Sequence, residues 1–176
     1  MKKLIVKKPA PGEYAPYLGK YIDVFAEKNV IDVLMEQKEK ASALLRSIPK
    51  EKEDYRYAEG KWSIKEVLGH VLDSERISVY RMLFIAHEEN VTLPSYNQEK
   101  WVSGCEYDSV SLLELVREFE LLREANYILL SRIKADEWLK RGTSNNNEIS
   151  VRALAYLMAG HAEHHFNVIR EKYLNN

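Results

Sequence analysis

The sequence has little cysteine and no surplus of charge of one sign. Its single cysteine, Cys105, cannot form an internal disulfide or supply a thiolate metal cage. The 26 lysines and arginines nearly balance the 27 aspartates and glutamates, whereas nucleic-acid binders usually carry a basic surplus. The N-terminus lacks the apolar core of a signal peptide, and no apolar run approaches the ~20 residues that cross a bilayer. We therefore expect a cytoplasmic protein that binds neither nucleic acid nor membrane.

Glycine and proline are also scarce, with seven and five residues, and the long segments between them carry helical periodicity. The content of 45% hydrophobic and 30% charged residues is typical of a globular protein. A chain of 176 residues has the size of one domain. We predict a lead-in over residues 1–28, with a short helix at 14–25 interrupted near Gly19, followed by a helical domain over 29–176.

Four long segments place apolar residues three and four positions apart, as helices with one buried face do. These helices are expected over about 29–47, 63–87, 108–134 and 150–173. No segment shows convincing strand alternation, so the predicted fold is all-α, a four-helix bundle.

Helix starts are marked by residues that can bond the exposed N–H groups of a first turn. Ser63 and Glu66 form a capping box, and Asp108 and Ser150 are expected to cap the third and fourth helices. Between the helices, 88–107 is a long connection without periodicity and 141–147 is a polar loop. A connection of that length often forms a lid or a pocket wall.

The last helix carries three of the five histidines within five residues: His161, His164 and His165. Because a helix turns by ~100° per residue, His161 and His165 share the apolar face and His164 lies near its edge. Two inward imidazoles one turn apart can reach one divalent cation. They could equally be core histidines satisfied by hydrogen bonds, or interface residues. His70, at the flank of the second helix's apolar face, is a third candidate ligand, because bundles build metal sites from facing helices.

The third helix directs two polar side chains, Arg123 and Asn126, towards the bundle interior. Buried polar groups are costly unless they are paired. The two residues therefore indicate either a polar pocket or pairing with carboxylates such as Glu66 or Glu75, and Arg123 could also extend outward along its aliphatic stem.

Several segments together resemble the DinB/YfiT-like superfamily of metal-binding four-helix proteins. The resemblance covers roughly residues 30–173 and is carried by KWSIKEVLGH at 61–70, Arg123, HAEHHFNVIR at 161–170, and YNQEKW at 96–101. It implies a divalent metal held by His70, His161 and His165. Nickel or zinc is expected first, and ligand type alone does not separate them from manganese or iron. His164 would lie outside the ligand set, and Asn97 stands where many members have an aspartate.

The resemblance also implies an activity, because members include thiol-dependent S-transferases and isomerases, and others named metal-dependent hydrolases. Three neutral ligands leave an open coordination position, which is typical of catalytic metal sites. Our leading hypothesis is a metal-dependent transferase that joins a low-molecular-weight thiol to an electrophilic small molecule. Arg123 and Asn126 would be the catalytic residues lining its pocket, with Tyr96 and Trp101 covering it.

Two alternatives remain open at this point. One is a hydrolase that uses the same metal to activate water. The other is a non-catalytic helical dimerisation module whose histidines are core or interface residues. The resemblance suggests a homodimer in either case.

Overall fold

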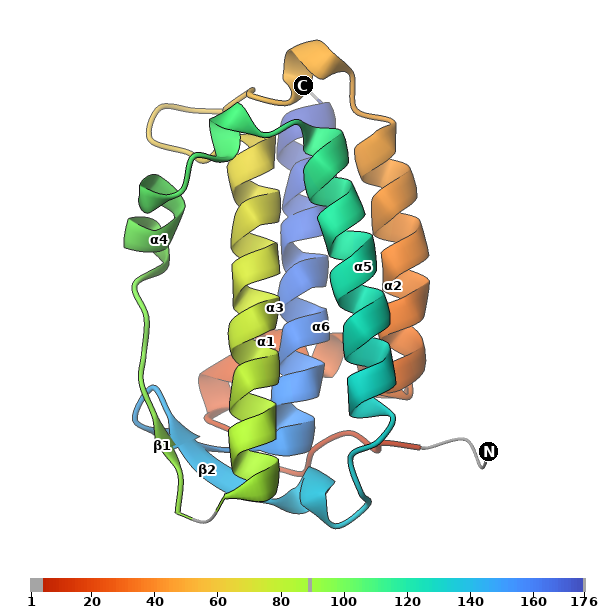
Figure 1. Cartoon of the computed structure of the whole chain (residues 1–176), viewed down its shortest axis with the longest axis vertical. Coiled ribbons are helices and arrows are strands. Elements are labelled where there is room, and N and C mark those ends of the chain that lie inside the picture. Colours follow the sequence, from red (N-terminus) through yellow and green to blue (C-terminus); the bar gives the residue numbers. More distant parts are fainter. Residues whose placement is uncertain (1–4, 89, 176) are drawn as a thin grey trace.

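Four long helices form the body of the molecule in the computed structural model, which describes residues 5–88 and 90–175 (Figure 1). They are α2 (Val30–Arg46), α3 (Ile64–His87), α5 (Leu112–Leu130) and α6 (Val151–Val168), which continues as a π-helix over Ile169–Leu174. The predicted four-helix bundle is therefore confirmed. Residues 1–4 of the predicted lead-in lie outside the described part of the chain.

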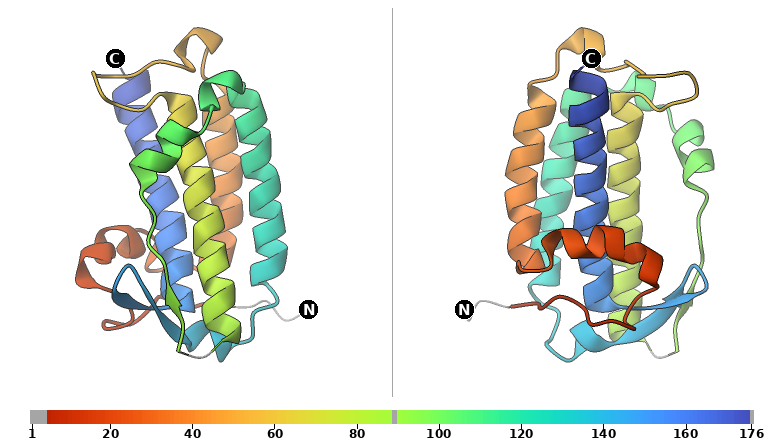
Figure 2. Two further views of the ribbon diagram at one scale, coloured as in Figure 1. Left: turned by 60° about the vertical axis from the view of Figure 1, so that its left-hand side comes forward. Right: turned by 180° about the vertical axis from the view of Figure 1, so that it is seen from behind.

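The helices run up, down, down and up in chain order, so that α3 and α5 are parallel (Figure 1). The main packing pairs are α3 with α6 and α2 with α5, each antiparallel. Two parallel helices require the chain to return along the bundle between them. The return segment contains β1 (Thr92–Leu93) and α4 (Gln98–Gly104), and it runs along the side of α3 (Figure 2). The return segment thereby covers one side of α3 (Figure 2).

Hydrogen bonds at the helix starts confirm two predicted caps and correct the third. Ser63 and Glu66 form the capping box of α3, and the Ser150 hydroxyl accepts from the Ala153 N–H at the start of α6. Asp108, however, lies in a 3₁₀ turn over 107–109, and α5 is opened by a second capping box, Ser111 with Glu114. The prediction for Asp108 was wrong, because Asp108 is only the first possible cap in this segment. The Ser111 side chain accepts from the Glu114 N–H, and the Glu114 side chain accepts from the Ser111 N–H, so this pair satisfies two N–H groups at the helix start.

A three-stranded sheet corrects the expectation that the chain has no strands. β1 pairs in parallel with β2 (Arg141–Ser144), which pairs antiparallel with β3 (Asn147–Ser150). Asn145 and Asn146 form the two-residue turn between β2 and β3, with φ of 51° and 61°, the left-handed conformation that such hairpins require. The predicted polar loop is thus part of a hairpin. Its strands of four residues are too short to show clear alternation in the sequence.

The N-terminal segment lies across α6 (Figure 2, right). The predicted short helix is present in three pieces: a 3₁₀ turn at Pro16–Leu18, α1 (Gly19–Ile22) and a second 3₁₀ turn at Asp23–Phe25. Contact is close at Gly160 of α6, where a Cβ atom would lie only 2.0 Å from the Tyr21 carbonyl oxygen. Glycine at this position is therefore what allows α1 to pack directly on the α6 backbone.

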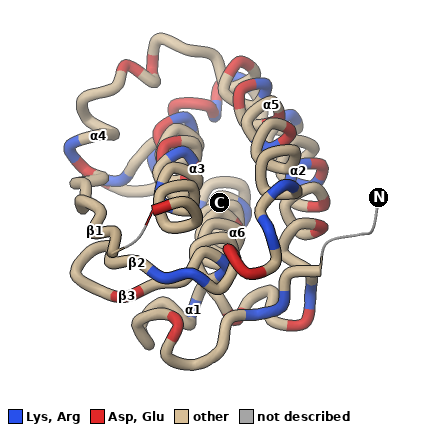
Figure 3. The backbone as a smooth tube through the Cα atoms, turned by 60° about the horizontal axis from the view of Figure 1, so that its bottom comes forward, with Lys and Arg blue, Asp and Glu red and all other residues tan. Residues whose placement is uncertain are grey.

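The buried core consists of two apolar clusters separated by a polar layer. The layer includes Gln37 of α2, Glu75 of α3, and Arg123 and Asn126 of α5, all buried. Residues of both charge signs are mixed along α2 and α5 (Figure 3). Over the described ranges, every helix falls short of the length or the apolar content that crossing a membrane demands.

Candidate metal centre

Three histidine side chains converge at the level of the polar layer. α3 contributes His70, two turns after its capping box begins the helix, and the antiparallel α6 contributes His161 and His165. The Nε2 atom of His161 lies 3.2 Å from that of His70 and 3.1 Å from that of His165. One potential ligand atom from each histidine lies within 4.8 Å of the other two. The structure therefore brings together all three predicted ligands.

The protonation state of these histidines fits a cation. Burial is the main cause that lowers the pKa of His70 to about 4, of His161 to about 3 and of His165 to about 2. The imidazoles are therefore neutral at pH 7, and their Nε2 atoms can present lone pairs to a common point. Nitrogen ligands at the usual 2.0–2.1 Å from a tetrahedral zinc ion are themselves roughly 3.3 Å apart. The residues present thus fit a divalent cation.

His164 lies outside this cluster, as its position near the edge of the apolar face predicts. Its side chain is exposed, and its ring contacts Tyr21 and His165 at centroid distances of 5.6 and 5.2 Å. It shares its helix and its residue type with the two converging histidines of α6, but not their direction.

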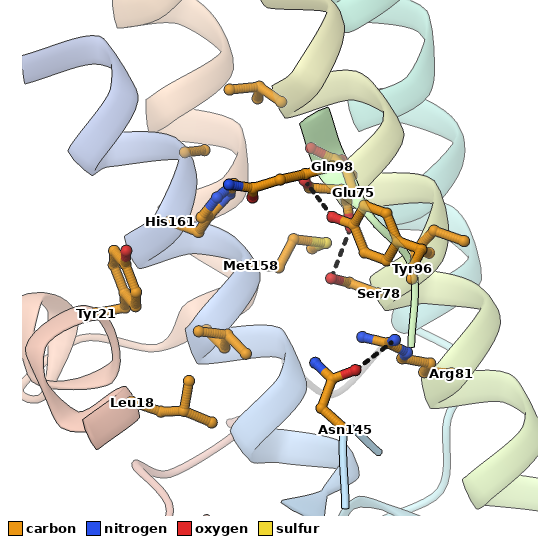
Figure 4. Close-up of a pocket in the computed structure, with 15 residues that line it drawn as sticks. Leu18, Tyr21, Glu75, Ser78, Arg81, Tyr96, Gln98, Asn145, Met158 and His161 are labelled. Carbon is orange, nitrogen blue, oxygen red and sulfur yellow. Dashed lines mark hydrogen bonds between the residues drawn. The ribbon is translucent and has the colours of Figure 1, made fainter. Parts of the chain in front are cut away.

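A cavity of about 300 Å³ opens beside His161 between α3, α6 and the hairpin turn (Figure 4). One wall is apolar and includes Leu18, Leu157 and Met158. The opposite wall is polar and consists of Ser74, Glu75, Ser78 and Arg81 of α3 with Tyr96, Gln98 and Asn145. The Ser74 and Tyr96 hydroxyls are 2.9 Å apart, which joins the return segment to α3. At this volume, the cavity suits a small molecule with both polar and apolar parts.

A second cavity of about 280 Å³ lies on the other side of the histidines. His165 lines it together with Trp62 and Tyr173. Trp62 also contacts the ring of His70 at a centroid distance of 4.8 Å. Gln98 of α4 lines both cavities, so the return segment borders each of them. The histidine cluster is therefore reached from two sides.

Arg123 and Asn126 do not line either of these cavities. Arg123 Nε donates to Glu75 Oε2 at 2.6 Å, and Asn126 Nδ2 donates to Glu75 Oε1 at 2.8 Å. Arg123 Nη1 donates to Gln37 Oε1 at 2.9 Å. The structure therefore shows pairing with Glu75, one of the two alternatives for these residues, and places Glu75 itself at the cavity wall. Glu66, the other carboxylate considered, pairs with Arg56 instead.

Tyr96 and Trp101 of the return segment were predicted to cover the pocket, and one of the two lines a cavity. Tyr96 lines the first cavity, whereas Trp101 contacts the Tyr96 ring at a centroid distance of 4.8 Å, tilted by 44°, and lines neither cavity. Asn97 caps α4, with its side-chain oxygen accepting from the Lys100 N–H at 3.0 Å. Asn97 thus has a structural role here, as the N-cap of α4.

Several residues of the first cavity were not predicted from the sequence, above all Arg81 and Asn145. A signal for Arg81 exists, because it follows His70 by 11 residues, three helical turns, and therefore shares its face of α3. Ser74 and Ser78 lie between them on that face. No comparable signal exists for Asn145, whose place depends on how the hairpin packs.

Taken together, the fold and the site define a four-helix bundle with a three-histidine site suited to a divalent metal. A family model, the DinB superfamily, matches residues 34–169. The chain belongs to the DinB superfamily, as the sequence resemblance predicted.

Individual relatives agree with this assignment. "Putative metal-dependent hydrolase OB0413" of Oceanobacillus iheyensis is 28% identical over 127 residues, 68% of this chain and 69% of the relative. A protein of the same description from Bacillus mycoides is 26% identical over 149 residues, 85% and 86% of the two chains. Among solved structures, YfiT from Bacillus subtilis, described as having an unusual four-helix bundle topology, aligns with a TM-score of 0.74 at 20% identity. It covers 81% of this chain and 82% of its own. That likeness concerns the fold.

Proposed function

We propose that this protein is a divalent-metal-dependent enzyme that acts on a small molecule, with His70, His161 and His165 as the metal ligands. The observation that carries the proposal is the convergence of three neutral Nε2 atoms, 3.1 and 3.2 Å apart along the two close pairs. Nickel or zinc is the expected ion, with manganese or iron as further candidates. A bound divalent cation lowers the pKa of a thiol or a water molecule that it contacts.

The finer proposal is that the enzyme transfers a low-molecular-weight thiol to an electrophilic small molecule. A transfer reaction needs room for two reactants, and the two cavities flanking the histidines supply separate spaces beside His161 and His165. Three neutral ligands also leave the full charge of the ion to stabilise an anionic sulfur. Tyr96 and Gln98 would shield the reacting groups from solvent on the side of the return segment.

Hydrolysis is the second candidate, and two observations favour it. Relatives with 26–28% identity carry the description of metal-dependent hydrolases. In addition, the Glu75 carboxylate lines the first cavity, where it could accept a proton from an attacking water molecule. Arg123 and Asn126 would then be positioning residues, because they hold Glu75 by hydrogen bonds at 2.6 and 2.8 Å.

The first test is the metal content of the purified chain after incubation with nickel or zinc and removal of excess ion. We expect about one ion per chain in the wild type and loss of most of it in His161→Ala. His164→Ala is the matched control, because this histidine lies on the same helix outside the cluster, and it should retain the ion. Equal metal contents in wild type and His161→Ala would overturn the metal site.

The second test separates the two reactions. The nickel- or zinc-loaded protein is offered a panel of small thiols with 1-chloro-2,4-dinitrobenzene, and in parallel a set of p-nitrophenyl esters. Thiol consumption that depends on the metal and on His161 supports transfer. Metal-dependent ester cleavage without thiol consumption overturns transfer in favour of hydrolysis.

If His161→Ala changes only the oligomeric state, the protein is a helical interaction module. The expected homodimer stays a prediction, which sedimentation of the wild type will check.

A further inference from the structure

Arg81 is a buried arginine at the far end of the first cavity. It lies on α3 on the same face as His70, only 7% exposed, and it lines the cavity that His161 borders. Eleven residues of helix separate the Cα atoms of His70 and Arg81 by about 16 Å along the axis. Both residues lie on the side of α3 that borders the cavity.

Among residues 5–88 and 90–175, the hydrogen-bond contacts of the Arg81 guanidinium group involve one of its three nitrogens. Nη2 donates to the Pro94 carbonyl at 2.8 Å and contacts Asn145 Oδ1 at 3.5 Å, and the Tyr96 ring centroid is 5.9 Å from the guanidinium carbon. A guanidinium group has five N–H donors, and both of these contacts use the same nitrogen. In Figure 4, the guanidinium group is directed into the cavity, with the Asn145 amide beside it.

Arg81 also lacks a carboxylate partner within the described ranges, unlike the buried Arg123 and the partly buried Arg152. Arg123 is paired with Glu75 and Arg152 with Glu13. Burial lowers the pKa of Arg81, but an arginine remains charged in proteins, so the cavity holds an uncompensated positive charge. The Glu75 carboxylate, which also lines this cavity, is already paired with Arg123 and hydrogen-bonded to Asn126. An anionic ligand would supply the missing charge.

We propose that Arg81 and Asn145 form an anion subsite and that the substrate is a small organic acid. Its carboxylate would accept from the Arg81 fork and the Asn145 amide, while its reacting end would lie beside His161. The apolar wall of Leu18, Leu157 and Met158 suits a short hydrocarbon chain between the two ends. A planar guanidinium group can pair with a carboxylate through two parallel hydrogen bonds. This inference deepens the proposed function by naming the substrate class.

The first arm of the test uses metal-free protein and so does not depend on the metal. Hexanoate and its neutral amide, hexanamide, are titrated while the Arg81 Nε–Hε resonance is followed by ¹H–¹⁵N NMR. We expect hexanoate to shift this resonance and to bind at least about tenfold more tightly than hexanamide, as a charged hydrogen-bonded pair implies. The preference for hexanoate over hexanamide should be absent in Arg81→Met. In Arg81→Lys, which keeps the positive charge, it should be present but smaller than in the wild type.

The second arm uses the metal-loaded protein with 6-mercaptohexanoate and 6-mercaptohexanamide, whose Kd values are compared by calorimetry. The same preference of about tenfold or more is expected in the wild type. It should also persist in Arg76→Met, the matched control, because Arg76 lies on the same helix but pairs with Glu118 on the surface. A thermal unfolding curve for each variant separates loss of the subsite from loss of the fold.

The two arms distinguish failure of this inference from failure of the proposed function. Equal affinity of wild type for acid and amide in both arms would overturn the anion subsite, whatever the metal content. A preference for hexanoate that depends on Arg81, in a protein that binds no metal, would support the subsite and refute the metal enzyme. If Arg81→Met does not fold, the ratio of acid to amide affinity in the wild type and in Arg81→Lys still shows whether the anion subsite exists.

Discussion

At the scale of single residues, Glu75 joins the interior of the bundle to the candidate site. It is 1% exposed, yet it borders the first cavity, and both of its oxygens accept hydrogen bonds from α5. Gln37 extends the same network to α6, because its Nε2 donates to the Ala159 carbonyl at 3.0 Å and to Glu163 at 2.8 Å. One polar network therefore links all four long helices next to the histidines.

We expect Glu75→Leu to lower the free energy of unfolding by about 3–5 kcal/mol, because it leaves the Arg123 guanidinium buried without a counter-charge. Urea unfolding at pH 7 measures the loss. Glu118→Leu is the matched control, since it removes an exposed pair with Arg76 and should cost at most about 1 kcal/mol. Adding Arg123→Met to Glu75→Leu should recover much of the stability. Equal losses at Glu75 and Glu118 would contradict the assigned role of the buried pair.

The directions of individual side chains could largely be predicted from the sequence, whereas their partners could not. Helical spacing alone places His161 and His165 on one inward face and His164 beside it. The same reasoning sends Arg123 and Asn126 inward, but it cannot decide between a pocket and an ion pair, because that depends on which helix lies opposite. Their partner Glu75 comes from a helix about 50 residues earlier in the chain.

At the scale of elements, the packing of α1 on α6 positions one wall of the first cavity. Leu18 and Tyr21 both line that cavity, and Tyr21 contacts the ring of His161 at a centroid distance of 5.7 Å. The close approach depends on Gly160, which directly precedes His161. The N-terminal segment is therefore part of the site although it lies outside the bundle.

We expect Gly160→Ala to destabilise the protein by about 1–3 kcal/mol, because the new Cβ would overlap the Tyr21 backbone and force α1 away from α6. Amide hydrogen exchange should show faster exchange over residues 16–25. Gly104→Ala, where an added Cβ would have no neighbour within 4 Å, is the control and should leave both measurements nearly unchanged. Unaltered protection of residues 16–25 in Gly160→Ala would refute the close-packing argument.

Elements with strong local signals are the ones that the sequence predicted. The long helices have apolar periodicity over four or more turns, and two of the three expected caps are in place. The short strands and α4 carry no such signal, because two to seven residues are too few to establish a period. Gln98 of the cavity begins α4, Tyr96 lies between β1 and α4, and Asn145 lies in the turn between β2 and β3. The candidate metal ligands could thus be predicted from sequence, and much of the substrate wall could not.

At the scale of the whole molecule, the order of the helices determines where the site lies. Because α3 and α5 are parallel, the chain between them must run the length of the bundle (Figure 1). Residues of that segment line both cavities, Tyr96 and Gln98 the first and Gln98 and Glu99 the second. Sequence periodicity does not specify helix direction, so this arrangement could not be derived from residues alone. The long connection over 88–107 was the only indication that the return is not a tight turn.

Glu13 connects two segments that are far apart in the sequence. Its side chain binds the lead-in to the start of α6. Its carboxylate accepts from Arg152, from the Ser150 hydroxyl at 2.7 Å and from the Ala10 N–H at 2.9 Å. Burial alone would raise the pKa of the Glu13 carboxyl, but these hydrogen bonds outweigh it and hold the pKa at about 2, below the ordinary 4.5. The ionised form is thus favoured by folding.

A lowered pKa in the folded state means that Glu13 stabilises the protein above pH 4.5 and that this contribution is lost as the pH falls towards 2. We expect Glu13→Gln to cost about 2–3 kcal/mol at pH 7, and the difference from wild type to shrink progressively below pH 4.5. Urea unfolding of both proteins between pH 7 and pH 3 measures the difference. Glu39→Gln, whose side chain is 75% exposed, should show little cost at any pH in this range. A Glu13→Gln cost that stays constant down to pH 3 would mean that shape and neutral hydrogen bonds, rather than the carboxylate charge, join the lead-in to α6.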